Sequence, residues 1–216
     1  MSAPTPHAHA PEGHPPGHPA DAFGAKFGMW LFLLTEIMLF GILFLMFANY
    51  YAKFPTEYHT AARELDVAFG ALNTAVLLTS SLTMVLGVTA THRGEAGRAV
   101  RWMAATIALA AVFLVIKAFE WSHKHETGVW PGAESLLVRP QGEIVFFGAY
   151  FLMTGLHAIH VVIGIGLIAV VAWRVRRPSG TDARRATLVE NTGLYWHIVD
   201  VIWIFLFPLF YLVGRR

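Results

Sequence analysis

The stretch that decides the fold is residues 195–208, which read YWHIVDVIWIFLFP. It is apolar enough to lie in lipid, yet it carries His197 and Asp200, which point to similar sides of a helix because they are three residues apart. A charge near the middle of a membrane span costs about 2.5–3.5 kcal/mol even on the insertion scale. Such side chains usually face a partner, a cavity or another subunit. The stretch therefore predicts a membrane helix with a polar side turned inward, kinked at Pro208.

The composition extends this prediction to the whole chain. Of its 216 residues, 56% are hydrophobic and 14% are charged, whereas a soluble domain carries roughly 25% charged residues. Apolar spans near the ~20 residues that cross a bilayer lie at 26–50, 66–91, 99–122, 144–173 and 191–213. Lipid offers backbone groups no partners, and the spans lack the two-residue alternation of a barrel wall. We therefore predict an all-α polytopic membrane protein, a bundle of five transmembrane helices over residues 26–216.

The basic residues are distributed unevenly between the predicted loops. Most of them lie between the second and third spans and between the fourth and fifth: Arg93, Arg98, Arg101, Arg174, Arg176, Arg177, Arg184 and Arg185. These loops are on the same side of the membrane. By the positive-inside rule, the N-terminus is cytoplasmic and the C-terminus periplasmic. The basic charge is thus a topology signal, and we expect no nucleic-acid binding.

Residues 1–25 differ from the rest in composition. They are rich in Pro, Ala, Gly and His, which predicts a disordered cytoplasmic tail. Transient binding of a soft metal by its histidines is the alternative, although their spacing matches no defined site. The chain has no cysteine, which excludes thiolate iron–sulfur clusters, haem attached through Cys-x-x-Cys-His and cysteine-bridged copper.

Glu36 is the most prominent polar residue within a predicted span. It lies about ten residues into the first span, hence ~15 Å from the span's inner end at 1.5 Å per residue. Its neighbours are apolar, so we expect its carboxyl to be neutral or tightly hydrogen-bonded. Two hypotheses follow: a proton-handling group, or a hydrogen bond that only fixes helix packing.

Two further pairs lie three residues apart on predicted helices. His157 and His160 in the fourth span could share a metal, but a metal needs more ligands, and two histidines on one turn cannot grip a haem from both faces. We therefore favour structural histidines that bond to Glu36 or to the fifth helix, and we predict no metal. Lys117 and Glu120, near the end of the third span, predict an ion pair close to the membrane surface or a contact with a partner.

Two long stretches resemble a known family. Residues 154–164, TGLHAIHVVIG, and residues 195–206, YWHIVDVIWIFL, are similar to helices of subunit III of the haem–copper oxidases, in that family's order and spacing. Supporting matches are Thr35-Glu36, Leu78-Thr79-Ser80-Ser81 and Phe119-Glu120-Trp121. The resemblance covers essentially everything after residue 25. The mitochondrial members have seven helices, whereas this chain matches only the last five, as several bacterial members do.

The resemblance implies a non-redox accessory subunit of a respiratory terminal oxidase in the bacterial plasma membrane. Haem and copper are expected in the partner catalytic subunit I, beside an electron-entry subunit II, and no catalytic residue or cofactor is expected in this chain; bound phospholipid is associated with the family. Glu36 matches the family's membrane glutamate, which is linked to proton uptake, to protection against inactivation during turnover and to modification by hydrophobic carbodiimides. His157, His160 and His197 are expected around Glu36, with Asp200 orienting His197.

Three alternatives remain at this stage. The same fold serves as an accessory subunit of nitric-oxide reductases. A dihaem membrane cytochrome would use His157, His160 and His197 as ligands, and the third alternative is an independent proton or ion transporter. A Soret band in the purified chain would favour the cytochrome, whereas isolation only with a haem–copper subunit would argue against a transporter.

Overall fold

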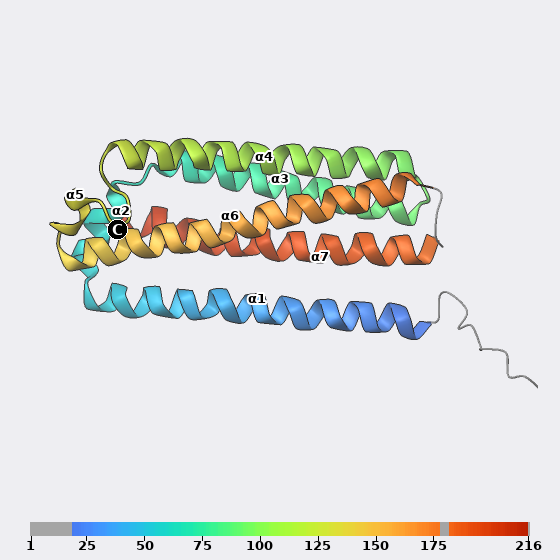
Figure 1. Ribbon diagram of the computed structural model, residues 1–216, viewed down its shortest axis with the longest axis horizontal. Coiled ribbons are helices and arrows are strands. Elements are labelled where there is room, and N and C mark those ends of the chain that lie inside the picture. The colour runs from blue at the N-terminus through green and yellow to red at the C-terminus, as the bar shows by residue number, and fades with distance from the viewer. Residues whose placement is uncertain (1–18, 178–181, 216) are drawn as a thin grey trace, which may run out of the picture.

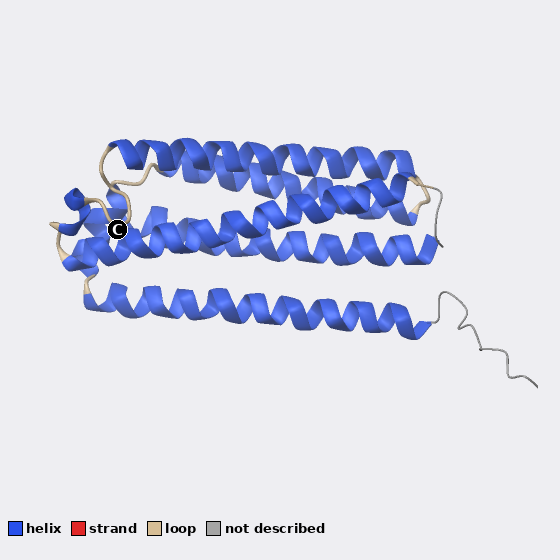
Figure 2. Cartoon of the chain, viewed as in Figure 1, coloured by secondary structure: helices blue, strands red, loops and turns tan. Residues whose placement is uncertain are grey.

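The computed structural model describes residues 19–177 and 182–215, and within these ranges the chain forms helices joined by short loops (Figure 2). The long helices are α1 (Pro19–Lys53), α3 (Val67–His92), α4 (Ala96–Glu126), α6 (Gln141–Arg176) and α7 (Asp182–Phe207). Two short helices, α2 (Pro55–Arg63) and α5 (Glu134–Leu137), lie in loops. After α7 come a π-helical turn, Pro208–Leu212, and a 3-10 turn, Val213–Arg215.

The described part of the chain contains five helices long and apolar enough to cross a membrane. The predicted all-α, five-span architecture is therefore confirmed. Helices α1, α4 and α6 extend beyond both ends of their predicted spans, whereas α3 has the predicted length. Because α1 begins at Pro19, residues 19–25 of the predicted tail are helical. The remainder of that tail, including the histidines considered for metal binding, lies outside the described residues.

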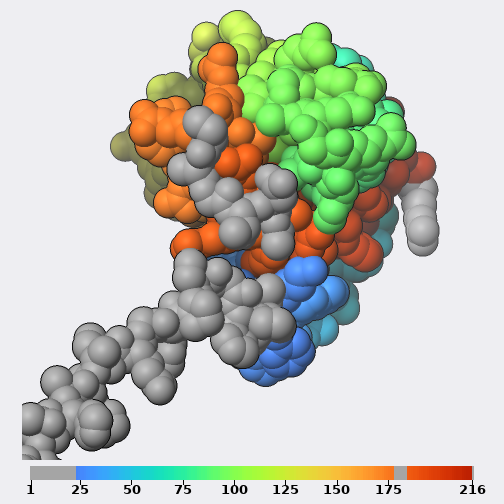
Figure 3. All heavy atoms as spheres, turned by 90° about the vertical axis from the view of Figure 1, so that its right-hand side faces the viewer, coloured from blue at the N-terminus to red at the C-terminus, as the bar shows by residue number. Residues whose placement is uncertain are grey.

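The helices are arranged around a central pair, α6 and α7 (Figure 1). The antiparallel helices α3 and α4 pack against each other, α7 packs on α3, and α6 packs on both α4 and α7. Helix α1 packs against α6 and α7 on the side of the bundle away from α4, as the end view also shows (Figure 3). Glu36 is thus carried by the most peripheral of the long helices.

Helices α6 and α7 approach closely at a glycine. A Cβ atom on Gly164 would lie 2.8 Å from two ring carbons of Trp196, whose own side chain is fully buried. Helix association in lipid depends on such small residues, since there is no hydrophobic drive between helices in hydrocarbon. Gly164 therefore sets the spacing between α6 and α7.

The end of the bundle that holds α2 is built on aromatic contacts that the sequence analysis missed. Tyr58 of α2 is fully buried, with its ring centroid 5.1 Å from that of Phe47 and 5.3 Å from that of Phe146. Burial raises the pKa of Tyr58 to about 12, with a smaller contribution from Tyr50, so its hydroxyl stays protonated. These contacts fasten α1, α2 and α6 together.

The beginning of α6 is capped from α2. Pro140, the residue before α6, provides no side-chain cap, and the Glu57 carboxylate instead accepts a hydrogen bond from the Gly142 N–H. A carboxylate is favourable there because it satisfies a free N–H and the helix N-terminus carries a partial positive charge. The short helix α2 thus positions the first turn of the helix that carries both histidines.

The chain turns inward at Pro208, where the sequence predicts a kink. Proline lacks the N–H that an α-helix needs, and the backbone continues as a π-helical turn. Phe210 and Tyr211 in this turn are fully buried. The irregular turn therefore delivers a tyrosine hydroxyl to the interior.

We predict that Gly164→Ala destabilises the chain by about 1–3 kcal/mol, because the added methyl group overpacks against Trp196. Thermal dissociation of the subunit from its purified complex would measure this as a lowered midpoint. Gly166→Ala is the matched control, since a Cβ there meets nothing within 4 Å. Equal thermal dissociation midpoints for Gly164→Ala and Gly166→Ala would contradict the close packing of Gly164 against Trp196.

Candidate functional site: polar groups in the bundle interior

Glu36 on α1 meets His160 on α6. The Glu36 Oε2 and His160 Nε2 atoms are 2.8 Å apart, and the side chains retain only 12% and 11% of their exposure. No hydrogen-bond donor for that oxygen is found among residues 19–177 and 182–215, so the imidazole is its sole polar contact there. The structure thus brings these two predicted site residues together.

The tautomer of the neutral His160 ring follows from its second contact. His160 Nδ1 lies 2.8 Å from the carbonyl oxygen of Leu156 one turn earlier. A carbonyl oxygen only accepts, so Nδ1 must carry a proton, and the lone pair of the neutral ring is on Nε2. In this tautomer the Nε2 atom of the ring, which carries no proton, faces the Glu36 carboxyl at 2.8 Å.

His157 lies one turn before His160 but faces another part of the bundle. It is fully buried, and its ring packs against Phe113 and Trp203, with centroids 5.5 and 5.2 Å away. In the described ranges, neither ring nitrogen of His157 has a hydrogen-bond partner. Within the described residues, His157 therefore does not make the expected contact with Glu36.

His197 belongs to a second polar group, between α7 and α3. Its Nδ1 lies 2.7 Å from the hydroxyl oxygen of Ser81. Asp200 is buried close to the same hydroxyl, although its oxygens make no hydrogen bond of normal geometry within the described ranges. Ser81 rather than Asp200 thus fixes the His197 ring, because the ring reaches across to α3 instead of along its own helix.

Lys117 and Glu120 form the third group. Their ammonium and carboxylate are 3.0 Å apart, and the two side chains are only 3% and 4% exposed. The hydroxyls of Tyr150 and Tyr211 donate to Glu120 Oε1 at 2.7 and 2.6 Å, and both also accept from Lys117 Nζ, at 2.9 and 2.7 Å. Four side chains from α4, α6 and the π-helical turn thus satisfy one another.

The Lys117 and Glu120 side chains form the ion pair that the sequence predicts, and the pair is buried within the protein. Helix α4 continues to Glu126, so Lys117 lies about 13 Å from its end at 1.5 Å per residue. The two tyrosines enclose the pair and exclude solvent. The sequence analysis missed both tyrosines, since a tyrosine in an apolar span gives no signal of its partner.

Among the described residues, no cluster of three or more His, Asp or Glu side chains could hold a metal ion. The arrangement provides a carboxyl–imidazole contact at Glu36 and His160, a hydrogen bond at His197, and a satisfied ion pair at Lys117.

Comparison with known proteins shows which family the chain resembles over most of its length. The family model described as cytochrome c oxidase subunit III matches residues 16–215. Cytochrome c oxidase subunit 3 of Thermostichus vulcanus is 34% identical over 193 residues, which are 87% of each chain. Cytochrome bo(3) ubiquinol oxidase subunit 3 of Pseudomonas aeruginosa is 29% identical over 94% of this chain and 91% of that one. A heme-copper oxidase subunit I+III of Aeropyrum pernix is 30% identical over 86% of this chain but only 22% of its own length.

We predict that Lys117→Met costs about 3–5 kcal/mol, because it leaves the buried Glu120 carboxylate without a cation. The double variant Lys117→Met with Glu120→Gln should recover most of this loss, since no unpaired charge remains. Thermal midpoints of the purified complex would compare the two. Arg98→Ala, which removes an exposed ion pair with Glu95, should have little effect. A double variant as unstable as the single one would contradict the charge argument.

Proposed function

Since the chain belongs to the cytochrome c oxidase subunit III family and is an accessory subunit of a haem–copper oxidase, we propose that it supports proton uptake by its complex through Glu36. Haem, copper and the reduction of oxygen belong to a partner catalytic subunit in this proposal, and electron entry belongs to a second partner. The chain itself contributes no redox centre.

The contact between Glu36 and His160 carries the proposal. A carboxyl and an imidazole that hold one proton between them can take up or release a proton by shifting it across 2.8 Å. The pair lies well inside the hydrophobic length of α1, where an isolated charge is costly. Its remaining exposure leaves an edge through which protons can be exchanged with water or with a neighbouring subunit. His160 is the positioning partner and Glu36 the exchanging acid.

The relatives support the choice of partners. The Aeropyrum pernix protein carries subunits I and III as one chain, according to its name, so that the two are neighbours there. We extend this arrangement to the present chain and propose that its catalytic partner is of the subunit I type. The relatives include both cytochrome c and ubiquinol oxidases, so the proposal does not depend on the electron donor.

The membrane orientation is the other part of the proposal. The arginines near the junctions of α3 with α4 and of α6 with α7 support an arrangement with the N-terminus in the cytoplasm of a bacterial cell. The end of the bundle with α2 and α5 would then face the periplasm (Figure 1). Glu36 would be reached from the cytoplasmic side, from which the oxidase takes its protons.

We predict that Glu36→Ala lowers severalfold the number of turnovers that the purified oxidase completes before it inactivates. Proton uptake through the pair is lost, while the redox centres are untouched. Stopped-flow proton uptake and prolonged oxygen-consumption assays would measure it. His160→Gln should produce the same defect, because the proton then lacks its second site. His197→Gln is the matched control, since His197 contacts Ser81 instead. If the Glu36→Ala oxidase completed as many turnovers before inactivation as the wild type does, the proposal would be refuted.

We also predict the orientation of two exposed residues. Because the chain has no cysteine, single cysteines at Arg93 and at Val138, which lie at opposite ends of the bundle, can be labelled selectively. An impermeant maleimide added to intact cells should label Val138→Cys and should reach Arg93→Cys only after lysis. The reverse pattern would invert the proposed topology.

A further inference from the structure

Three ionisable side chains from three helices meet at the end of the bundle opposite α2, the end that faces the viewer in Figure 3. Glu190 of α7 holds one partner on each carboxylate oxygen. Its Oε2 lies 2.7 Å from Nζ of Lys26 on α1, and its Oε1 lies 2.9 Å from Nε2 of His92 on α3. Lys26, His92 and Glu190, which we call the Glu190 cluster, therefore connect α1, α3 and α7.

The contact between His92 and Glu190 depends on the charge of the ring. A carboxylate only accepts, so the Nε2 atom of His92 donates in this contact. Both the neutral ring with its proton on Nε2 and the imidazolium can donate there. The bond from the imidazolium is charge-assisted and roughly twice as strong as a neutral one. The contact therefore forms in both charge states and is stronger when His92 is charged.

The position of His92 on its helix acts in the same direction. His92 lies in the last turn of α3, where the unpaired carbonyl groups of a helix carry a partial negative charge. A cation in the last turn is favourable for this reason. A proton on His92 therefore stabilises the end of α3 and strengthens its bond to α7 at the same time.

The surrounding charges leave His92 as the group that responds to pH. The other charged groups described at this end, on the elements around His92, are Lys26, Arg93, Glu95, Arg98 and Arg185. Glu95 and Arg98 pair with each other at 2.7 Å. Lys26 and Arg93 are cations and oppose a charge on His92, but their own charge is constant over the range in which imidazole titrates. Histidine is the side chain whose charge ordinarily changes between about pH 5 and 8.

We propose that the Glu190 cluster is a pH-sensitive tether, in which protonation of His92 strengthens the joint between the end of α3 and the beginning of α7. Because Glu190 is then held in the orientation that also meets Lys26, the beginning of α1 is stabilised as well. As the pH rises, Glu190 keeps Lys26 but loses the charge of His92. That this end senses the cytoplasm, from which the oxidase takes its protons, rests on the proposed orientation; the tether itself does not.

The test is hydrogen–deuterium exchange of the purified complex at about pH 6 and about pH 8, on either side of the imidazole titration. Peptides spanning residues 86–95 and 23–33 report on the ends of α3 and α1. Comparing variants at one pH removes the pH dependence of intrinsic exchange. His92→Gln keeps a donor but cannot become charged. Both peptides should exchange about threefold faster than in the wild type at the lower pH, the factor expected for a partly exposed ion pair. They should exchange as in the wild type at the higher pH.

Two further variants establish that the charge is responsible. His92→Lys carries a cation at both pH values, so the two peptides should exchange more slowly than in the wild type at the higher pH. Glu190→Gln removes the shared carboxylate, and adding His92→Gln to it should have little further effect on the α1 peptide. If Glu190→Gln does not assemble, the His92 variants decide.

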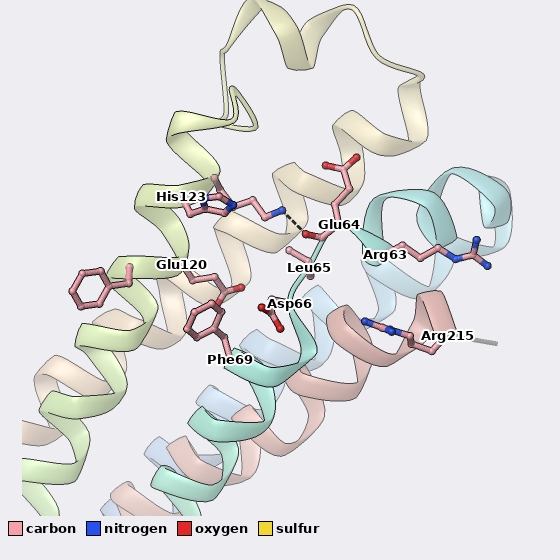
Figure 4. A pocket seen from close by; sticks show the side chains of 10 residues that line it. Arg63, Glu64, Leu65, Asp66, Phe69, Glu120, His123 and Arg215 are labelled. Carbon is pink, nitrogen blue, oxygen red and sulfur yellow. Dashed lines mark hydrogen bonds between the residues drawn. The ribbon is translucent and has the colours of Figure 1, made fainter.

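His123→Gln is the matched control. His123 also lies in the last turn of a long helix, α4, but beside the pocket at the opposite end of the bundle (Figure 4), and it makes no ion pair among the described residues. Its variant should exchange as the wild type does in both peptides.

Equal exchange of wild type and His92→Gln at the lower pH would overturn the proposal. A difference of the same size at both pH values would also overturn it, because the effect would then be independent of charge. Since exchange is measured without turnover, none of these outcomes depends on Glu36.

Discussion

The bilayer gives a polar side chain no partner, and the interior of this bundle is organised by that constraint. Each ionisable group in a span either finds a partner within the protein or must stay uncharged. Lys117 and Glu120 illustrate the first case, because two tyrosine hydroxyls complete the hydrogen bonds that the ion pair leaves open. One of these hydroxyls comes from the turn after Pro208. The position of the π-helical turn that carries Tyr211 therefore depends on the Lys117 and Glu120 ion pair of α4.

The same constraint separates the polar residues into distinct groups. The Glu36 and His160 pair joins α1 to α6, whereas His197 and Ser81 join α7 to α3. His157 lies between aromatic rings and joins neither, so the single network that the resemblance implied is divided among several helix contacts. A change at Glu36 can then act on α1 without disturbing the ion pair that holds α4 and α6.

The sequence was sufficient for the five spans and for the list of polar residues, because hydropathy and helical spacing are local properties. It predicted the kink at Pro208 for the same reason. It could not predict which residues meet, since Tyr150 and Tyr211 are brought to Glu120 by helix packing and by the π-helical turn. The short helix α2 was missed because its stability comes from burial of Tyr58 against α1 and α6. A short, polar sequence gives no sign of such contacts.

The peripheral position of α1 gives the pair of Glu36 and His160 a second role that follows from its geometry. Near one end, α1 is held by Lys26, which is 2.7 Å from Glu190 of α7. Near the other end it is held by Phe47, whose ring contacts Tyr58 of α2. Between these points, the contact at Glu36 is the polar link from α1 to α6. Under the proposed function, loss of the proton that Glu36 and His160 share would place a carboxylate opposite the lone pair of the ring, and the two would repel. Proton exchange and helix packing would then not compete as explanations of Glu36, because the exchanged proton would also attach α1 to the bundle.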